Sequence, residues 1–141
     1  MSELPDRRGR IRVLIVDDIA EVRQTLKEHV ASDPDLCVVG EASNGIEAVL
    51  QFRLLAPDVV SMNINMPDMD GITATECLTE RPGGARVVIV SVVASEPDHY
   101  HRASRAGAIA CLDKPVDRAE YVRALNMAAQ EPPRRTGSGV T

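Results

Sequence analysis

The 141-residue chain is short of aromatic side chains: it has no tryptophan, one phenylalanine and two tyrosines. A hydrophobic core must therefore be built from aliphatic side chains, and the hydrophobic fraction of 44% is ordinary for a globular domain. A surface that stacks nucleobases needs aromatic rings, so their scarcity argues against nucleic-acid binding. The net charge of −5 argues the same way, because phosphate backbones are bound by basic surfaces.

Cysteine is also scarce, with three single residues that show no C-x-x-C spacing. Such cysteines are typical of reduced thiols in a cytoplasmic protein rather than of a disulfide scaffold or a zinc site. The sequence lacks a long apolar run and a signal-peptide pattern, so we expect no contact with a membrane. It also lacks the G-x-x-x-x-G-K phosphate loop and the G-x-S-x-G nucleophile elbow, which argues against the enzymes that carry those motifs.

What the sequence does contain is five short apolar runs that alternate with segments of helical periodicity. The apolar runs predict strands at residues 11–16, 37–40, 59–62, 87–90 and 109–112. Helices are predicted at 19–30, 46–56, 72–79 and 97–106, and after Asp117, which has capping-box spacing to Glu120. The alternation predicts an α/β fold: a doubly wound, five-stranded parallel sheet of the flavodoxin-like order 2-1-3-4-5 with five helices.

A single domain accounts for this length, and we place it at residues 10–130. Residues 1–9, which include Arg7 and Arg8, are expected to form a disordered leader. Residues 131–141 begin with Glu131, Pro132 and Pro133, and glycine and serine follow further on. This composition predicts a disordered tail or the start of a linker.

Polar residues follow four of the predicted strands, at the edge where such sheets form their functional crevice. Asp17 and Asp18 follow the first strand, Asn63 the third, Ser91 the fourth and Lys114 the fifth. Taken alone, the two aspartates could simply cap the helix that follows them. Together, two acids, a lysine and a strand-end carboxylate would form a phosphorylatable aspartate with its metal, but position 63 holds a carboxamide.

Several separated motifs resemble the receiver domain of two-component response regulators. They are, in chain order, Val16-Asp17-Asp18, Asn65-Met66-Pro67-Asp68-Met69-Asp70-Gly71, Ser91, Gly107-Ala108 and Lys114-Pro115. The resemblance covers roughly residues 10–130. In that family a histidine kinase passes a phosphoryl group to an aspartate, and an acidic pair holds Mg²⁺.

The resemblance implies a role for each residue of the metal site. Asp18 would bind Mg²⁺ directly and Asp17 would hold it through water. Asn65 would offer its backbone carbonyl, a hard oxygen that suits Mg²⁺. Lys114 would pair with the oxygens of the phosphoryl group or of its acceptor.

The resemblance also assigns the remaining positions of the site. Ser91 would donate a hydrogen bond to the phosphoryl group, and Asn63 occupies the phosphoacceptor position. Cys111 occupies the position of a switch residue that is usually tyrosine or phenylalanine, and its side chain is too small to act as a swinging ring.

Asn63 is the departure that matters most for function. An amide nitrogen conjugated to a carbonyl is not a useful nucleophile, so Asn63 cannot form an acyl phosphate. The substitution also removes a negative charge, which at ~4 Å from a cation is worth roughly 4 kcal/mol at an effective dielectric of about 20. We therefore expect Mg²⁺ binding to be possible but weakened.

These observations leave more than one hypothesis for function. The favoured one is an atypical receiver, not an enzyme, that binds a histidine kinase, an output or ATPase domain, or a second copy without phosphorylation. Tyr100, Tyr121 and Val122 predict a homodimer through the face of the fourth helix, fifth strand and fifth helix. The alternative is an ordinary phosphoreceiver locked inactive by an engineered Asn63. A third hypothesis, an aspartyl-phosphate hydrolase that uses Asp17, lacks the Asp-x-Asp pair which that chemistry needs.

A shorter likeness concerns the type of receiver. The stretch at residues 90–93, followed by Asp98-His99-Tyr100 and Arg102-Ala103, resembles receivers fused ahead of MinD-like ATPases in pilus-assembly proteins. This likeness would make residues 131–141 the start of a connection to a further domain. A stand-alone receiver with a frayed end is an equal alternative.

Overall fold

The computed structural model describes residues 9–80 and 83–134, and it contains a five-stranded parallel sheet. The strand order is β2-β1-β3-β4-β5, so the predicted order is confirmed. The central strands are buried on both faces, which explains why they appear in the sequence as continuous apolar runs. The strands are β1 (Ile11–Val16), β2 (Leu36–Ala42), β3 (Val59–Met62), β4 (Val87–Ser91) and β5 (Ala110–Asp113).

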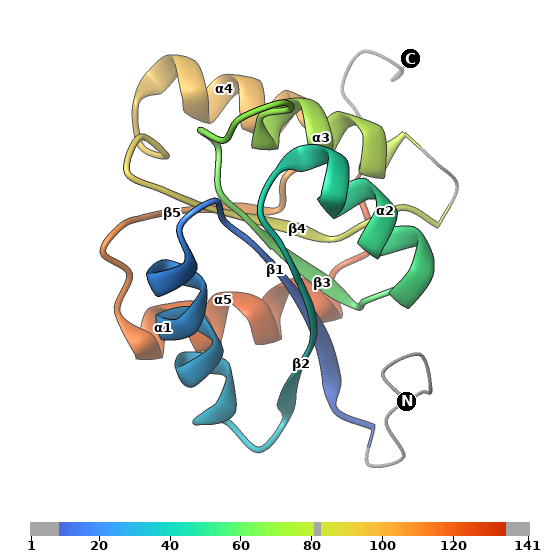
Figure 1. The fold of residues 1–141 in the computed structure, drawn as a ribbon, viewed down its shortest axis with the longest axis vertical. Coiled ribbons are helices and arrows are strands. Elements are labelled where there is room, and N and C mark those ends of the chain that lie inside the picture. The colour runs from blue at the N-terminus through green and yellow to red at the C-terminus, as the bar shows by residue number, and fades with distance from the viewer. Residues whose placement is uncertain (1–8, 81–82, 135–141) are drawn as a thin grey trace.

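Five helices cover the two faces of this sheet. Helices α2, α3 and α4 lie on one side and helices α1 and α5 on the other, as Figure 1 shows. Each layer of helices encloses its own apolar cluster against the sheet. The helices are α1 (Ala20–Ala31), α2 (Gly45–Leu55), α3 (Gly71–Thr79), α4 (Pro97–Ala106) and α5 (Arg118–Gln130).

The two clusters divide the core by the alternation of side chains along the strands. Leu14 and Ile89 point into the cluster under α2, α3 and α4, and Val13 and Val88 point into the cluster under α1 and α5. Both clusters are almost entirely aliphatic, as the shortage of aromatic residues predicted. The buried exception is Tyr121, whose side chain is 0% exposed in the second cluster.

Local sequence signals set the helix ends. Asn44, Asp70 and Asp117 each occupy an N-cap position, and their side chains accept a hydrogen bond from the backbone N–H three residues later. Pro97 begins α4 and Gly107 ends it with a φ of 107°, a left-handed conformation that glycine adopts without strain. The predicted bounds of α4 are therefore confirmed, because both of its ends carry a strong signal.

Strand ends without such signals are less well predicted. Strand β2 runs from Leu36 to Ala42 rather than from 37 to 40, because its backbone continues to pair with β1 through Gly40 to Ala42. Strand β5 is shifted by one residue to Ala110–Asp113, because Asp113 pairs in register with Ser91 of β4. The sequence analysis did not include Asp113 in this strand, but β5 is at the edge of the sheet and Asp113 is exposed.

The predicted leader and tail fall mostly outside the described residues, which begin at Gly9 and end at Arg134. The last helix ends at Gln130, where the domain was predicted to end. Just beyond it, the Glu131 carbonyl accepts a hydrogen bond of 2.6 Å from Arg86 Nε. Among the described helices, none has both the length and the apolar character needed to cross a membrane.

Candidate functional site

The predicted site residues come together because parallel strands end at the same edge of the sheet. The Asn63 N–H donates to the Val16 carbonyl at 3.0 Å, which sets the end of β3 beside the end of β1. The Lys114 N–H donates to the Ser91 carbonyl at 3.1 Å, which sets the end of β5 beside the end of β4. The structure therefore places Asn63, Lys114 and Ser91 at the edge that also carries the acidic pair.

The side-chain amide of Asn63 is buried and holds two acceptors. Its Nδ2 donates to Asp18 Oδ1 at 3.2 Å and to the Asn65 carbonyl oxygen at 3.0 Å. Both partners are pure acceptors, so the nitrogen rather than the oxygen of the amide must face them. Asn63 thus donates hydrogen bonds to Asp18 and to the Asn65 carbonyl, two of the groups that the resemblance assigned to Mg²⁺.

Asp17 forms a buried ion pair with Lys114. Lys114 Nζ lies 2.6 Å from Asp17 Oδ2, and the Asp17 side chain is almost completely buried. The second oxygen, Oδ1, accepts from the Ile19 N–H at 2.9 Å. The lysine was predicted to serve phosphoryl or acceptor oxygens, and in the structure it neutralises the neighbouring acid.

The alternative in which the aspartates only cap the first helix does not describe this geometry. The N-cap of α1 is Ile19, and the helix has no side-chain cap. Asp17 and Asp18 precede that position and turn towards Lys114 and Asn63. Their side chains therefore belong to the site at the sheet edge.

Ser91 and the loop after β4 are fixed by contacts from both sides. The Ser91 side chain is buried, and its Oγ accepts from the Val93 N–H at 3.3 Å. Asp113 Oδ1 accepts from the Ser95 N–H at 2.9 Å and so ties this loop to β5. Asp113 was missed by the sequence analysis, and its position directly before the Lys114-Pro115 motif is the signal that could have revealed it.

Cys111 is half-buried at the predicted switch position and packs against the cluster under α2, α3 and α4. Burial and the nearby Asp113 carboxylate raise the pKa of the Cys111 thiol to about 11. The thiol is therefore neutral at ordinary pH and behaves as a small apolar group. Cys37, Cys77 and Cys111 all lie in the described residues, and none of them forms a disulfide.

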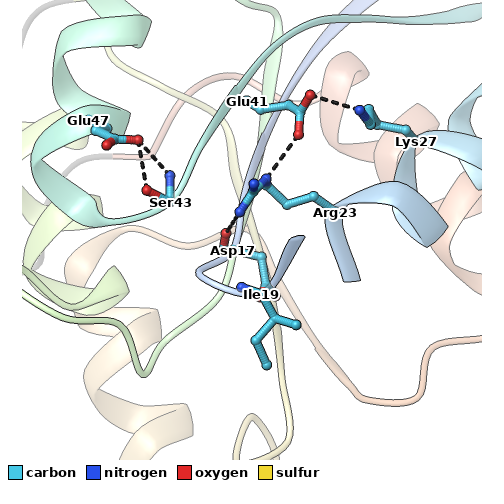
Figure 2. Close-up of polar contacts among 7 residues, drawn as sticks. All are labelled: Asp17, Ile19, Arg23, Lys27, Glu41, Ser43 and Glu47. Atoms are coloured by element: carbon cyan, nitrogen blue, oxygen red, sulfur yellow. Dashed lines mark hydrogen bonds and ion pairs between the residues drawn. The ribbon is translucent and has the colours of Figure 1, made fainter. Parts of the chain in front are cut away.

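A network of charged side chains supports the acidic loop from α1 and β2, as Figure 2 shows. Arg23 donates to the Asp17 carbonyl oxygen through Nη1 at 2.7 Å and to Glu41 Oε1 through Nε at 2.9 Å. Lys27 Nζ lies 2.8 Å from Glu41 Oε2. Hydrogen bonds and charge from Lys27 and Arg23 hold the pKa of Glu41 below its usual range, against a smaller opposing effect of burial.

The sequence analysis missed Arg23 and Glu41 as supporting residues. Arg23 lies one helical turn into α1, and Glu41 is next to last in β2, so the ends of two elements meet beside Asp17. A pattern in the sequence could have indicated this contact. It consists of a basic residue in the first turns of the helix after the acidic pair and an acid near the end of the neighbouring strand.

Asp17, Asp18 and Asn65 are the residues to which the resemblance assigned Mg²⁺. Each predicted ligand residue already accepts a hydrogen bond from the chain itself: Asp17 from Lys114, and Asp18 and Asn65 from Asn63. Over residues 9–80 and 83–134, no cluster of three or more histidine, cysteine or acidic side chains is placed to hold a metal. The two carboxylates and the Asn65 carbonyl are oxygen donors of the kind that Mg²⁺ takes, and in this structure each residue also accepts a hydrogen bond from within the chain.

The structure corrects one residue of the predicted self-association surface. Tyr121 is fully buried, and its ring contacts the His29 ring in a tilted arrangement, with centroids 6.0 Å apart and an interplanar angle of 60°. Burial raises the pKa of Tyr121 strongly, the Asp17 carboxylate raises it further, and the Ser61 hydroxyl acts in the opposite direction. The prediction that Tyr121 contributes to a dimer surface is wrong, whereas Tyr100 is exposed on α4.

The parallel sheet and the cluster of Asp17, Asp18, Asn63 and Lys114 at one of its edges together define a receiver-type signalling domain. A family model described as the response regulator receiver domain matches residues 13–126. The chain therefore belongs to the response regulator receiver family.

Curated relatives and solved structures agree with this assignment. A protein-glutamate methylesterase/protein-glutamine glutaminase of Cereibacter sphaeroides is 44% identical over 77% of this chain, and one of Myxococcus xanthus is 43% identical over 75%. The crystal structure of the response regulator domain of Thermotoga maritima CheB has a TM-score of 0.82 and 35% identity, and covers 88% of this chain and 99% of that one.

A second solved structure is a CheX-CheY-BeF3-Mg+2 complex from Borrelia burgdorferi, with a TM-score of 0.76 and 31% identity over 86% of this chain and 95% of that one. The chain spans about 30% of the length of the two curated relatives. Their methylesterase and glutaminase activities therefore describe proteins much longer than this one.

Proposed function

We propose that this chain is an atypical receiver that works by protein–protein interaction without phosphorylation, and that it has no enzymatic activity of its own. The observation that supports this most directly is the pair of hydrogen bonds from Asn63 Nδ2 to Asp18 and to the Asn65 carbonyl. The amide nitrogen lacks nucleophilic character and also occupies the oxygens that a metal would need.

We further propose that Mg²⁺ binds this site more weakly than it binds a receiver with an aspartate at position 63. An added ion would have to compete with Asn63 for Asp18 and with Lys114 for Asp17. It would also find one negative charge fewer than in an ordinary receiver, and the attraction of a divalent ion falls with each charge that is removed.

The partner of such a domain would be a cytoplasmic histidine kinase or an output domain, in the same chain or in another. The face formed by α4, β5 and α5 suits this role, because α4 exposes Tyr100 and also carries the exposed basic side chains of Arg102 and Arg105. The methylesterase portion of the curated relatives and a MinD-like ATPase of a pilus-assembly system are two candidate outputs.

A second candidate function is that of an ordinary phosphoreceiver in which Asn63 replaces a natural aspartate and locks the off state. The complete ion pair between Asp17 and Lys114 favours this reading, since a receiver without chemistry has no need to keep it. The small Cys111 at the switch position favours the atypical receiver, because a block on phosphorylation would not require that change.

Beryllofluoride with Mg²⁺ tests the proposal. The unchanged chain should form no adduct and should show little Mg²⁺ binding by calorimetry, whereas Asn63→Asp should gain both. Asn44→Asp is the matched control, because it makes the same chemical change at an N-cap where aspartate is also favoured.

The response to the restored carboxylate separates the two candidates. If Asn63→Asp gives an adduct and the adduct changes partner binding or oligomeric state, the locked phosphoreceiver is correct. An adduct without such a change supports the atypical receiver. Mass spectrometry that found an acyl phosphate on the unchanged chain would contradict the proposal outright.

A further inference from the structure

Strand β2 contains an irregularity shortly before it reaches the site. Val13 of β1 pairs with Val38, and the next residue, Leu14, pairs with Gly40. Val39 is therefore an extra residue in β2, which makes a β-bulge. A bulge re-aims the side chains that follow it, and bulges are common beside functional sites.

The bulge turns over the faces of the end of β2. Val38 packs against the cluster under α1 and α5, whereas Ala42, four residues later, lies in the cluster under α2, α3 and α4. In a regular strand these two side chains would share a face, because successive side chains alternate. Glu41 directly precedes Ala42, so it points to the opposite face, which α1 covers.

On that face Glu41 meets two basic side chains of α1. Its Oε1 accepts from Arg23 Nε at 2.9 Å, and its Oε2 lies 2.8 Å from Lys27 Nζ. Arg23 and Lys27 are four residues apart and therefore follow each other along one side of the helix. The hydrogen bond from Lys27, above all, lowers the pKa of Glu41, so the side chain is a carboxylate at neutral pH.

Arg23 carries this contact on to the acidic loop. Its Nη1 donates to the Asp17 carbonyl at 2.7 Å, and Figure 2 shows the guanidinium between Glu41 and Asp17. The Asp17 N–H donates to the Ala42 carbonyl at 3.0 Å. Strand β2 thus holds both backbone polar groups of Asp17, one directly through Ala42 and the other through Glu41 and Arg23.

We propose that Glu41 is a positioning residue for the acidic loop. Acting through Arg23, it fixes the backbone of Asp17 and thereby the place of two carboxylates, those of Asp17 and Asp18. The bulge at Val39 aims Glu41 at this task, since regular alternation would turn it to the other face of the sheet. The role does not depend on whether the chain can be phosphorylated, because both candidate functions keep the acidic loop.

The contact most sensitive to the position of the loop is the hydrogen bond from Asn63 Nδ2 to Asp18 Oδ1. At 3.2 Å it lies at the long end of the range for N–H···O bonds, so a small displacement of the loop would break it. The ion pair of Asp17 and Lys114 tolerates a larger movement, because the lysine side chain is flexible. The side-chain amide resonances of Asn63 therefore report where the loop lies.

Heteronuclear NMR of the 141-residue chain tests the role of Glu41. Glu41→Ala should shift the side-chain amide resonances of Asn63 by more than their line width. Arg23→Lys should shift them as well, because one ammonium group replaces the two guanidinium nitrogens that bond to Glu41 and Asp17. Lys27→Met should have a smaller effect, since Glu41 would keep its bond to Arg23.

Glu28→Ala is the matched control, because it removes an acid of α1 that accepts from Gln24 at 3.2 Å. It should leave the Asn63 resonances in place. Urea unfolding separates positioning from general stabilisation. Arg23→Lys keeps a cation beside Glu41 at the surface, so its midpoint should stay close to that of the unchanged chain while the resonances still move.

Metal binding gives a second readout in an Asn63→Asp background. There Glu41→Ala should raise the dissociation constant for Mg²⁺ about tenfold, an effect of the size that residues supporting a metal ligand commonly have. Glu28→Ala should leave that constant unchanged. The NMR measurement uses the chain with its carboxamide, so its result on Glu41 stands even if Asn63→Asp fails to gain Mg²⁺ and the proposed function is wrong.

Two results would overturn the inference. If Glu41→Ala and Arg23→Lys leave the Asn63 resonances where they are in the unchanged chain, β2 does not set the position of the acidic loop. If Glu28→Ala moves the resonances as far as Glu41→Ala does, the cause is the change in net charge and not the contact with Arg23.

Discussion

At the scale of the single residue, the ion pair of Asp17 and Lys114 is the contact whose removal should cost most. Both groups are largely buried and 2.6 Å apart, so Lys114→Met would leave the Asp17 charge without its partner. We expect a loss of about 3 kcal/mol in the free energy of unfolding. Urea unfolding monitored by circular dichroism measures this loss.

The double variant Asp17→Asn with Lys114→Met provides the control for this prediction. Removing both charges leaves no buried ion unpaired, so at least about half of the lost stability should return. If the double variant is as unstable as Lys114→Met, the lysine acts through packing of its aliphatic chain rather than through its charge.

Cys111 should react slowly with alkylating agents while the chain is folded. Its pKa of about 11 lies above that of an exposed thiol, so the reactive thiolate is a minor species at pH 8. In a Cys37→Ser, Cys77→Ser background, the rate with iodoacetamide should rise with pH to a midpoint near 11. Because the folded state holds this proton more tightly, its contribution to stability is complete below the unfolded pKa and is lost as pH rises through 11.

If the alkylation rate of the folded chain at pH 8 equals the rate in urea, burial does not protect this thiol.

The sequence could predict which residues meet at the site, but not which bonds they form. Asp17, Asn63, Ser91 and Lys114 were placed together by the rule that parallel strands end at one edge. The side-chain partners depend on rotamers and on competing donors, and these are tertiary properties. The preference of Lys114 for Asp17 therefore became clear only in the structure.

At the scale of the secondary-structure element, the start of α3 is the most constrained feature. The Gly71 N–H donates to the Ile64 carbonyl at 2.8 Å, and a Cβ at Gly71 would overlap the Asn63 backbone carbonyl. Gly71→Ala should therefore push the Asn63 segment aside and cost about 2 kcal/mol or more. Chemical denaturation gives the cost, and amide shifts of residues 63–65 report the displacement.

Gly83→Ala is a control for Gly71→Ala, because a Cβ at Gly83 would meet no atom within 4 Å. Gly83 has a φ of 69°, so this control carries a small backbone cost of its own and should leave the 63–65 segment in place. A displacement of that segment in the Gly83 variant alone would contradict the packing argument.

Elements were predicted best where the chain carries an explicit end signal. Helix α4 has Pro97 at one end and Gly107 at the other, and its bounds were predicted without error. Strand β5 lacks such signals, and its last residue is a polar Asp113 that periodicity assigns to a loop. Pairing with a neighbouring strand decides such ends, and a single sequence does not contain that register.

At the scale of the whole molecule, the two apolar clusters should unfold together. They are separated by the sheet but share its strands, since Leu14 and Val13 are neighbours on β1 and face opposite clusters. Leu78→Ala in one cluster and Leu125→Ala in the other should each cost about 2–5 kcal/mol. Both should lower the midpoint of the same cooperative transition, detected by calorimetry.

Two separate transitions in either leucine variant would mean that one helical layer can detach from the sheet.

The topology was the most predictable property of the molecule. Alternating apolar runs and amphipathic segments permit few arrangements, because crossovers between parallel strands are right-handed and connections are short. The exposure of single side chains was less predictable, and Tyr121, which was expected at a surface, is buried. A tyrosine has an apolar ring and a polar hydroxyl, so its type does not indicate whether it lies on the buried or the exposed face of a helix. The sequence alone therefore left the position of Tyr121 on α5 undecided.

The contact of Asn63 with Asp18 and the Asn65 carbonyl has one further implication. Under the function that we propose, a pocket whose acceptors are satisfied from within the chain would keep its shape whether a donor kinase is active or idle. The variable left to a cell is then the number of copies that it makes. Expression level, rather than covalent state, would set the strength of any signal that passes through this domain.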